Sequence, residues 1–157
     1  HAAAIPTHLR AQGSLQDLYR LILDDAPDRV AAVVDIVADD LPGPVFVHCA
    51  AGKDRTGIVV AALLLAADVE PEAVIDDYVA TAANMDALIQ RWAEAARRAG
   101  RTPRDDAFND TWLRAPREAI TEVVERFETA PDGARGWLSS HGASAERIDA
   151  WRNRITT

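Results

Sequence analysis

Residues 48–57, His-Cys-Ala-Ala-Gly-Lys-Asp-Arg-Thr-Gly, contain the only cysteine and the only lysine of the chain. A cysteine thiolate is a nucleophile, and the guanidinium of Arg55, six residues after Cys49, can bind two phosphate oxygens at once. The apolar residues 45–47 predict a buried strand before this segment, and the apolar residues 56–67 predict a buried helix after it. Backbone N–H groups of a tight turn and of a helix start bind anions, so the segment is a candidate phosphate site.

Each residue type around the turn suits one task in phosphoester hydrolysis. Cys49 would be the nucleophile, because the turn and Arg55 stabilise a thiolate that can attack phosphorus and form a cysteinyl-phosphate. Water would then hydrolyse this intermediate. Thr56 could hydrogen-bond the sulfur and help it leave, and the ring N–H of His48 could fix the loop and tune the thiolate.

The leaving oxygen also needs a proton, and Asp54 is the local candidate for the general acid. Other carboxyl groups stay open as alternatives: Asp24, Asp25, Asp76 and Asp77. We expect no metal and no other cofactor, because the loop and Arg55 can handle the charge. The four scattered histidines offer no ligand spacing.

A nucleotide-binding P-loop is the closest alternative for this turn, and its pattern fails at two positions. Gly52 and Lys53 are followed by Asp54, where that motif requires Ser or Thr, and its first glycine would fall at Val47. Gly52 and Gly57 instead suit a turn that needs unusual dihedral angles or a close approach.

The rest of the chain has the pattern of helices. Apolar spacing, caps and prolines predict them near 15–22, from 27, from 71, over 85–99, over 116–129, near 137 and over 144–155. One buried strand cannot satisfy its own backbone. We therefore expect further sheet strands from residues upstream of this sequence, or else a dimer that shares strands.

Composition limits the functional class. The chain has 157 residues, a formal net charge of −8 and a pI of about 4.9, which disfavours a nucleic-acid-binding protein. We expect no integral membrane segment, because no run of about 18 uncharged apolar residues occurs. Cytoplasmic and secreted locations both stay open, since the sequence begins with His1 and shows no signal-peptide pattern. Abundant alanine and arginine with scarce lysine are typical of a GC-rich bacterial source.

The segment matches the His-Cys-x5-Arg-Ser/Thr signature of the cysteine-dependent protein tyrosine phosphatases at His48, Cys49, Gly52, Arg55, Thr56 and Gly57. Its fuller form, HCAAGKDRTG, resembles bacterial tyrosine phosphatases of the group that contains the mycobacterial secreted phosphatase PtpB. The helix with Tyr19 and the segments VIDDYVAT, GWLSSHG and IDAWRNRI are also similar to that group. The resemblance covers most of this chain, but only the C-terminal part of a typical member.

The resemblance implies a fold. The expected class is α/β, with a predominantly parallel central sheet flanked by helices, and with N-terminal strands missing from this sequence. The chain 1–157 would be a single phosphatase domain that carries a helical lid at about 71–113. Arg97, Arg98, Arg101 and Arg104 form a basic cluster there, which we interpret as a solvated helix face rather than a lipid site.

The resemblance also implies roles in the loop. Cys49 would be the nucleophile and Asp54 the general acid, and Lys53 would be a rim cation, shared with phosphoinositide phosphatases, for a second phosphate. Backbone N–H groups would bind the phosphate at Ala50, Ala51, Gly52, Lys53, Asp54 and Arg55.

The implied function is a protein tyrosine phosphatase with phosphotyrosine proteins as substrates, and with dual-specificity or phosphoinositide activity as extensions. A non-catalytic phosphate-binding pseudophosphatase, an incomplete fragment and an inositol-polyphosphate phosphatase are the alternatives.

Overall fold

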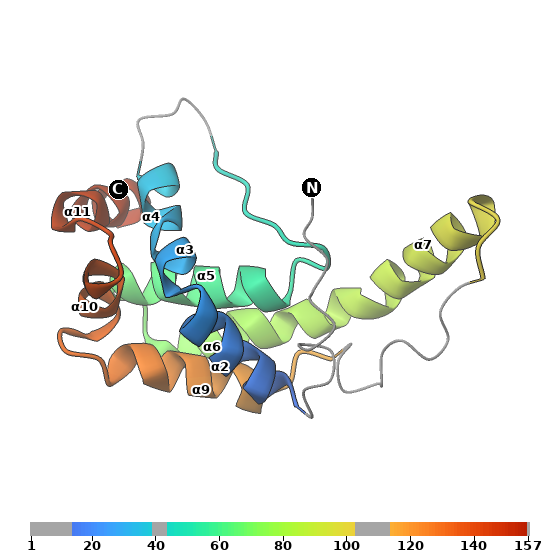
Figure 1. Cartoon of the computed structure of the whole chain (residues 1–157), viewed down its shortest axis with the longest axis horizontal. Helices are drawn as coiled ribbons and strands as arrows, with labels where there is room; N and C mark the ends of the chain where they lie inside the picture. The colour runs from blue at the N-terminus through green and yellow to red at the C-terminus, as the bar shows by residue number, and fades with distance from the viewer. Residues whose placement is uncertain (1–13, 39–43, 103–113, 157) are drawn as a thin grey trace.

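The computed structural model describes residues 14–38, 44–102 and 114–156, and most helices of this part, all except η1 and α7, share one hydrophobic core (Figure 1). In chain order these helices are α2 (Leu15–Asp25), α3 (Pro27–Ala31), α4 (Val33–Val37), α5 (Asp54–Ala66), α6 (Pro71–Ala80), the 3-10 helix η1 (Thr81–Asn84), α7 (Met85–Arg98), α9 (Arg117–Glu128), α10 (Gly133–Ser140) and α11 (Ala145–Thr156).

Local sequence signals account for several helix starts. The Ser14 side chain accepts a hydrogen bond from the Asp17 N–H at 3.1 Å and caps α2. Pro27 and Pro71 open α3 and α6, where a missing N–H leaves no helical bond unmade. The helix expected from residue 27 is present as two short helices, α3 and α4, which are separated at Ala32.

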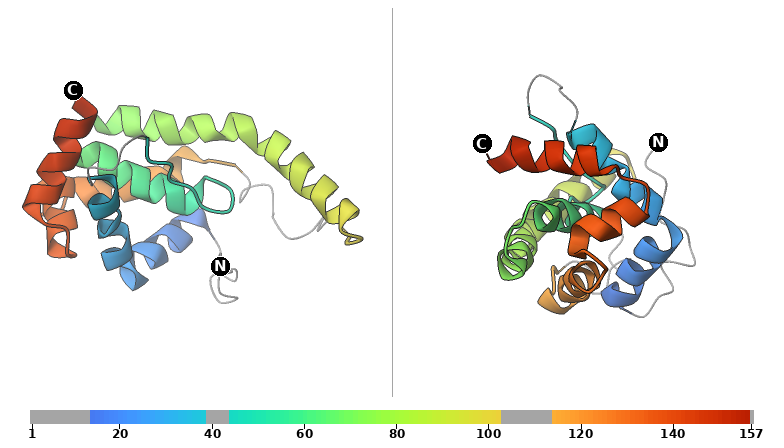
Figure 2. Two further views of the ribbon diagram at one scale, coloured as in Figure 1. Left: turned by 90° about the horizontal axis from the view of Figure 1, so that it is seen from above. Right: turned by 90° about the vertical axis from the view of Figure 1, so that its left-hand side faces the viewer.

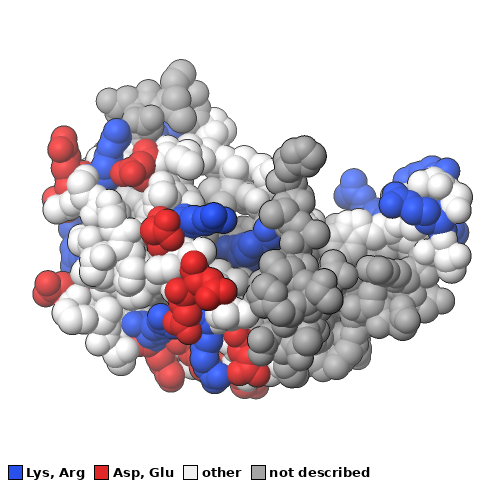
Figure 3. Space-filling model, in the orientation of Figure 1, with Lys and Arg blue, Asp and Glu red and all other residues white. Residues whose placement is uncertain are grey.

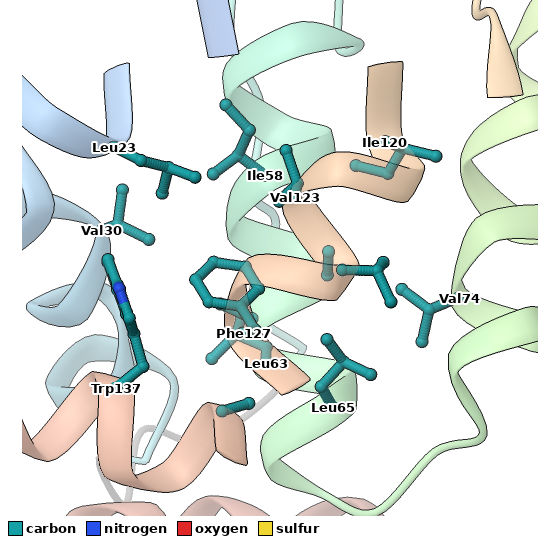
Figure 4. Packing of buried hydrophobic residues seen from close by; sticks show 14 of the residues in the cluster. Leu23, Val30, Ile58, Leu63, Leu65, Val74, Ile120, Val123, Phe127 and Trp137 are labelled. Atoms are coloured by element: carbon teal, nitrogen blue, oxygen red, sulfur yellow. The ribbon is translucent and has the colours of Figure 1, made fainter. Parts of the chain in front are cut away.

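Helix α5 lies at the centre of the described part. It packs against α9, α10 and α6, and also contacts α2 and α3 (Figure 2). None of residues 58–66 is exposed, which agrees with the apolar run in the sequence. Side chains from α2, α3, α6, α9 and α10 meet those of α5 in the core, among them Leu23, Ile58 and Phe127 (Figure 4).

The predicted central sheet is wrong for the part of the chain that the structure describes, which contains no strand. Residues 45–47 run extended, with Val45 and Val47 packed against the core, while Phe46 is 85% exposed. This alternation fits an extended segment with one face on the core. No backbone hydrogen bond joins the segment to another described residue. Because a strand requires a paired neighbour, an apolar β-prone run by itself does not make one.

Helices α6 and α7 form the region predicted as a lid. Helix α6 packs on α5 and α9 and buries Val74, Ile75 and Tyr78, so it belongs to the core. Helix α7 extends away from the body, and of its residues only Met85 is buried (Figures 1 and 2). Residues 103–113 of the predicted lid lie outside the described residues.

The basic cluster lies at the far end of α7. Arg97, Arg98 and Arg101 are exposed there, and blue side chains gather at this tip in Figure 3. Arg104 lies outside the described residues. Within the described part, every helix is too short or too polar to cross a bilayer.

Candidate active site

The Cys49 loop, residues 49–53, joins the extended segment to the first turn of α5. Gly52 has a φ of +68°, a left-handed conformation that glycine adopts without the penalty of a side chain. Helix α5 begins at Asp54, two residues before the predicted start, with Lys53 as its N-cap residue and no side-chain cap. The N–H groups at this helix start are therefore available for an anion.

The backbone of the loop favours the charged form of the Cys49 thiol. The N–H groups of Thr56, Lys53 and Ala51 contribute to this effect. Burial of the thiol raises its pKa, but the Thr56 hydroxyl and these N–H groups lower it. The pKa of Cys49 is, as a result, below its ordinary value of 9.0. A lowered thiol pKa favours the nucleophilic thiolate.

Thr56 places an unpaired hydroxyl beside the sulfur. Its Oγ1 is buried and makes no formal hydrogen bond within the described part of the chain, although the hydroxyl contributes to lowering the pKa of Cys49. A neutral thiol is a weak hydrogen-bond acceptor. A thiolate or a phosphate oxygen would supply the acceptor that this hydroxyl lacks.

Arg55 is half-buried in the first turn of α5 and forms no ion pair with a described carboxylate. Its guanidinium charge is therefore available for a ligand. His48 is exposed. Its Nδ1 lies 3.2 Å from the Cys49 carbonyl oxygen, and its ring stacks on Phe46 with centroids 5.4 Å apart. These contacts support a role in fixing the loop, while its effect on the thiolate stays a prediction.

Lys53 and Asp54 form a close ion pair behind the loop. Lys53 Nζ donates to Asp54 Oδ1 at 2.6 Å, and the lysine is only 1% exposed. The ammonium of Lys53 is buried against Asp54, and its role as a rim cation stays a prediction. Its backbone N–H contributes to lowering the pKa of Cys49. The predicted phosphate contacts of Ala50 and Gly52 stay predictions.

The sequence profile described as the tyrosine phosphatase family matches residues 2–157. This chain belongs to the tyrosine phosphatase family. A curated tyrosine-protein phosphatase from Nostoc commune is 29% identical over 146 residues, which is 90% of this chain and 49% of that protein. The chain therefore spans about half the length of this relative.

In this member of the tyrosine phosphatase family, the alternative candidates for the general acid differ in their partners and positions. Asp24 pairs with Arg126, and Asp76 pairs with Arg117, each at 2.7 Å. Asp25 is exposed at the end of α2.

Asp77 is the alternative acid that lies near the loop. It lines a cavity of about 70 Å³ together with Gly52 and Lys53. Asp54 lies within the segment that surrounds the thiol, so its position favours it over the other carboxyl groups.

The sequence analysis missed two tyrosines of this phosphatase-family site. The Tyr19 hydroxyl on α2 donates to Asp54 Oδ1 at 2.8 Å and lies 2.5 Å from the Tyr78 hydroxyl on α6. Tyr78 occurs in the VIDDYVAT segment and Tyr19 in the first predicted helix, both of which resemble the family. No local pattern joins Tyr19 to Asp54, because the contact spans 35 residues of sequence.

Among the described residues, no group of three His, Cys, Asp or Glu side chains is arranged to hold a metal ion. The described part of the site contains the Cys49 thiol, the Arg55 guanidinium and the N–H groups at the start of α5.

Proposed function

We propose that this chain is the catalytic part of a cysteine-dependent protein tyrosine phosphatase that requires no metal. The observation that carries the proposal is the position of the Cys49 thiol in the loop that leads into the uncapped N-terminus of α5, where N–H groups of the loop and helix also lower the pKa of the thiol. Donors that hold a thiolate can also bind the oxygens of a phosphate seated above it. The HCAAGKDRTG segment supports placing the chain in the PtpB group.

The proposed first step transfers the phosphoryl group to Cys49. The thiolate attacks phosphorus, an S–P bond forms, and the P–O bond to the substrate tyrosine breaks. The electron pair goes to the phenolic oxygen, which takes a proton from Asp54. Arg55 binds two oxygens of the transferring group and offsets their charge.

The second step releases inorganic phosphate. Water attacks phosphorus, the S–P bond breaks, and the Asp54 carboxylate takes the proton from water. The sulfur leaves as a thiolate, which the Thr56 hydroxyl and the loop N–H groups stabilise. Asp54 is then protonated again and Cys49 is again a thiolate, so the cycle closes.

We propose phosphotyrosine proteins as the first substrate class. The phosphoinositide extension depended on a free lysine cation at the rim, and the Lys53 ammonium is instead paired with Asp54. Lipid or dual-specificity activity is therefore a secondary proposal, which the same assay can compare.

The test is release of inorganic phosphate from a phosphotyrosine peptide in the presence of a chelator, with Cys49→Ser as the blank. We expect release from the natural sequence and none from the variant. Arg55→Ala should weaken both substrate binding and rate, because it removes the bidentate contact. Absence of release in a folded protein that still binds phosphate would favour the non-catalytic module.

A further inference from the structure

Asp54 is the end point of a buried chain of hydrogen bonds. Its Oδ1 accepts from Tyr19 Oη at 2.8 Å and from Lys53 Nζ at 2.6 Å. Tyr19 Oη lies 2.5 Å from Tyr78 Oη. The four residues come from α2, the end of the loop, the first turn of α5, and α6.

The direction of the chain follows from counting protons. A phenol has one O–H proton, and Tyr19 donates it to the carboxylate. The Tyr19 oxygen must then accept from Tyr78, so Tyr78 is the donor of the 2.5 Å bond. Tyr19 and the Lys53 ammonium thus both donate to one oxygen of Asp54, and Tyr78 donates to Tyr19.

The two phenols are held as permanent donors. Tyr19 is 1% exposed and Tyr78 is 4% exposed. Burial, with the nearby Asp54 charge, raises the pKa of both hydroxyls far above the ordinary tyrosine value. Their rings meet edge-on, with centroids 6.3 Å apart and an interplanar angle of 89°. Neither ring can move without disturbing the core.

A purely structural role explains this arrangement less well. Burying a hydroxyl destabilises the fold unless it is hydrogen-bonded, and phenylalanine would fill the same space without that requirement. Here the chain of two hydroxyls ends on the carboxyl group inside the Cys49 loop. It fixes Oδ1 and leaves Oδ2 as the oxygen that can carry a proton.

We propose that Tyr19, supported by Tyr78, is a positioning residue that holds Asp54 in the orientation required of the general acid. This inference rests on the proposed function and deepens it. The hydrogen bonds restrict rotation of the carboxyl group, so that Oδ2 delivers its proton to the leaving oxygen. The need for this positioning grows as the leaving group becomes poorer, because a poor leaving group depends more on proton transfer.

The test compares leaving groups in the Tyr19→Phe variant, which keeps the ring and removes the hydroxyl. For phenyl phosphate and a phosphotyrosine peptide, kcat should fall about tenfold, the worth of one well-placed hydrogen bond. For p-nitrophenyl phosphate, whose phenoxide leaves readily, kcat should change less than about twofold. KM should hold for all three substrates, because the phosphate contacts are intact.

Two further variants separate positioning from general destabilisation. Tyr78→Phe removes the donor that supports Tyr19. It should give the same dependence of kcat on the leaving group, with a smaller loss of kcat. Thr121→Val removes a hydroxyl that donates to the Arg117 carbonyl within α9. It should not lower kcat for one substrate more than for the others. In an Asp54→Asn background, Tyr19→Phe should have no further effect, because the group that it positions is gone.

The outcomes distinguish this inference from the proposed function. If the natural sequence releases no more phosphate than Cys49→Ser, the proposed function fails and this inference fails with it. If the natural sequence is active and Tyr19→Phe slows all three substrates equally, the function stands and the positioning role is overturned. Equal losses in the presence and absence of the Asp54 carboxyl group would overturn it as well. If Tyr19→Phe does not fold, Tyr78→Phe decides by the same comparison.

Discussion

At Cys49, burial raises the pKa of the thiol, and the polar groups of the loop lower it by more. Thr56 contributes through both its hydroxyl and its N–H, so it provides the largest share of the lowering. The rate of alkylation by iodoacetamide should therefore rise with pH at a midpoint below the ordinary thiol value of 9.0. Removing the Thr56 hydroxyl should move this midpoint upward.

Alkylation rates of the natural sequence and of Thr56→Val, measured across pH, check this prediction at the single cysteine. Thr121→Val, the same change in α9, is the matched control and should leave the midpoint in place. A Thr56→Val profile that overlays the natural one would assign the pKa shift to the backbone N–H groups alone.

The buried ammonium of Lys53 forms an ion pair with Asp54. Lys53→Met keeps much of the volume of the side chain but removes the charge that faces Asp54 Oδ1. Because the Asp54 side chain is 21% exposed, we expect the free energy of unfolding to fall by about 2 kcal/mol, less than for a fully buried pair. Urea unfolding measures this change.

Binding of inorganic phosphate should survive the same substitution, because the backbone N–H of Lys53 remains. Competitive inhibition by phosphate should thus change by about twofold or less, whereas Arg55→Met, the control, should weaken it by about tenfold or more. A similar loss in both variants would place the Lys53 ammonium in contact with phosphate and contradict the buried pair.

At the scale of elements, the packing of α6 on the start of α5 depends on Gly57. A Cβ at this position would lie 2.7 Å from Cδ2 of Tyr78, which is closer than real contacts allow. Gly57 thus permits the close approach that the sequence analysis offered as one of two explanations. Gly57→Ala should lower the free energy of unfolding by about 1–3 kcal/mol, because the ring must shift.

Equilibrium unfolding of Gly57→Ala, alone and combined with Tyr78→Leu, checks the contact. The smaller side chain frees the space, so the two effects should be less than additive. Gly100→Ala is the control: it introduces a side chain at a φ of +67° with nothing within 4 Å, and so tests conformation without a clash. Additive effects at Gly57 and Tyr78 would mean that they do not collide.

The helices were predictable because their signals are local. The cap at Ser14, the prolines that open α3 and α6, and the apolar spacing of α9 all act within a few residues. The prediction of a strand at residues 45–47 was wrong because strand pairing is not local. These β-prone residues form no backbone hydrogen bond with another described residue. The sequence of a segment indicates its preferred backbone conformation, but not which segments lie beside it.

The residues that make up the Cys49 loop were predictable from sequence, but the directions of the side chains around it were less so. The thiol, its N–H donors and the free Arg55 follow the spacing of the segment. The direction of the Lys53 side chain and the Tyr19–Tyr78 pair depend on three helices meeting. The two tyrosines are 59 residues apart, so no local pattern joins them.

At the scale of the whole molecule, the two tyrosines behind Asp54 make the stability of the fold depend on pH. The chain has two tyrosines, and both belong to the hydrogen-bonded pair behind Asp54. Both have a pKa raised by burial in the folded state, whereas in the unfolded chain each titrates near about 10. Below that pH both states keep their phenol protons, so the contribution of the pair to stability is complete and constant.

Above about pH 10 the unfolded state loses these protons while the folded state keeps them. The free energy of unfolding should then fall by up to about 1.4 kcal/mol per pH unit for each tyrosine, until the raised pKa values are reached. Urea unfolding across this range checks the slope. Tyrosinate absorbance should appear only as helical circular dichroism is lost. In the double variant Tyr19→Phe, Tyr78→Phe, the free energy of unfolding should fall less steeply with pH. Tyrosinate that forms near pH 10 in a folded protein would show that the two hydroxyls are open to water, and that nothing holds Asp54 from behind.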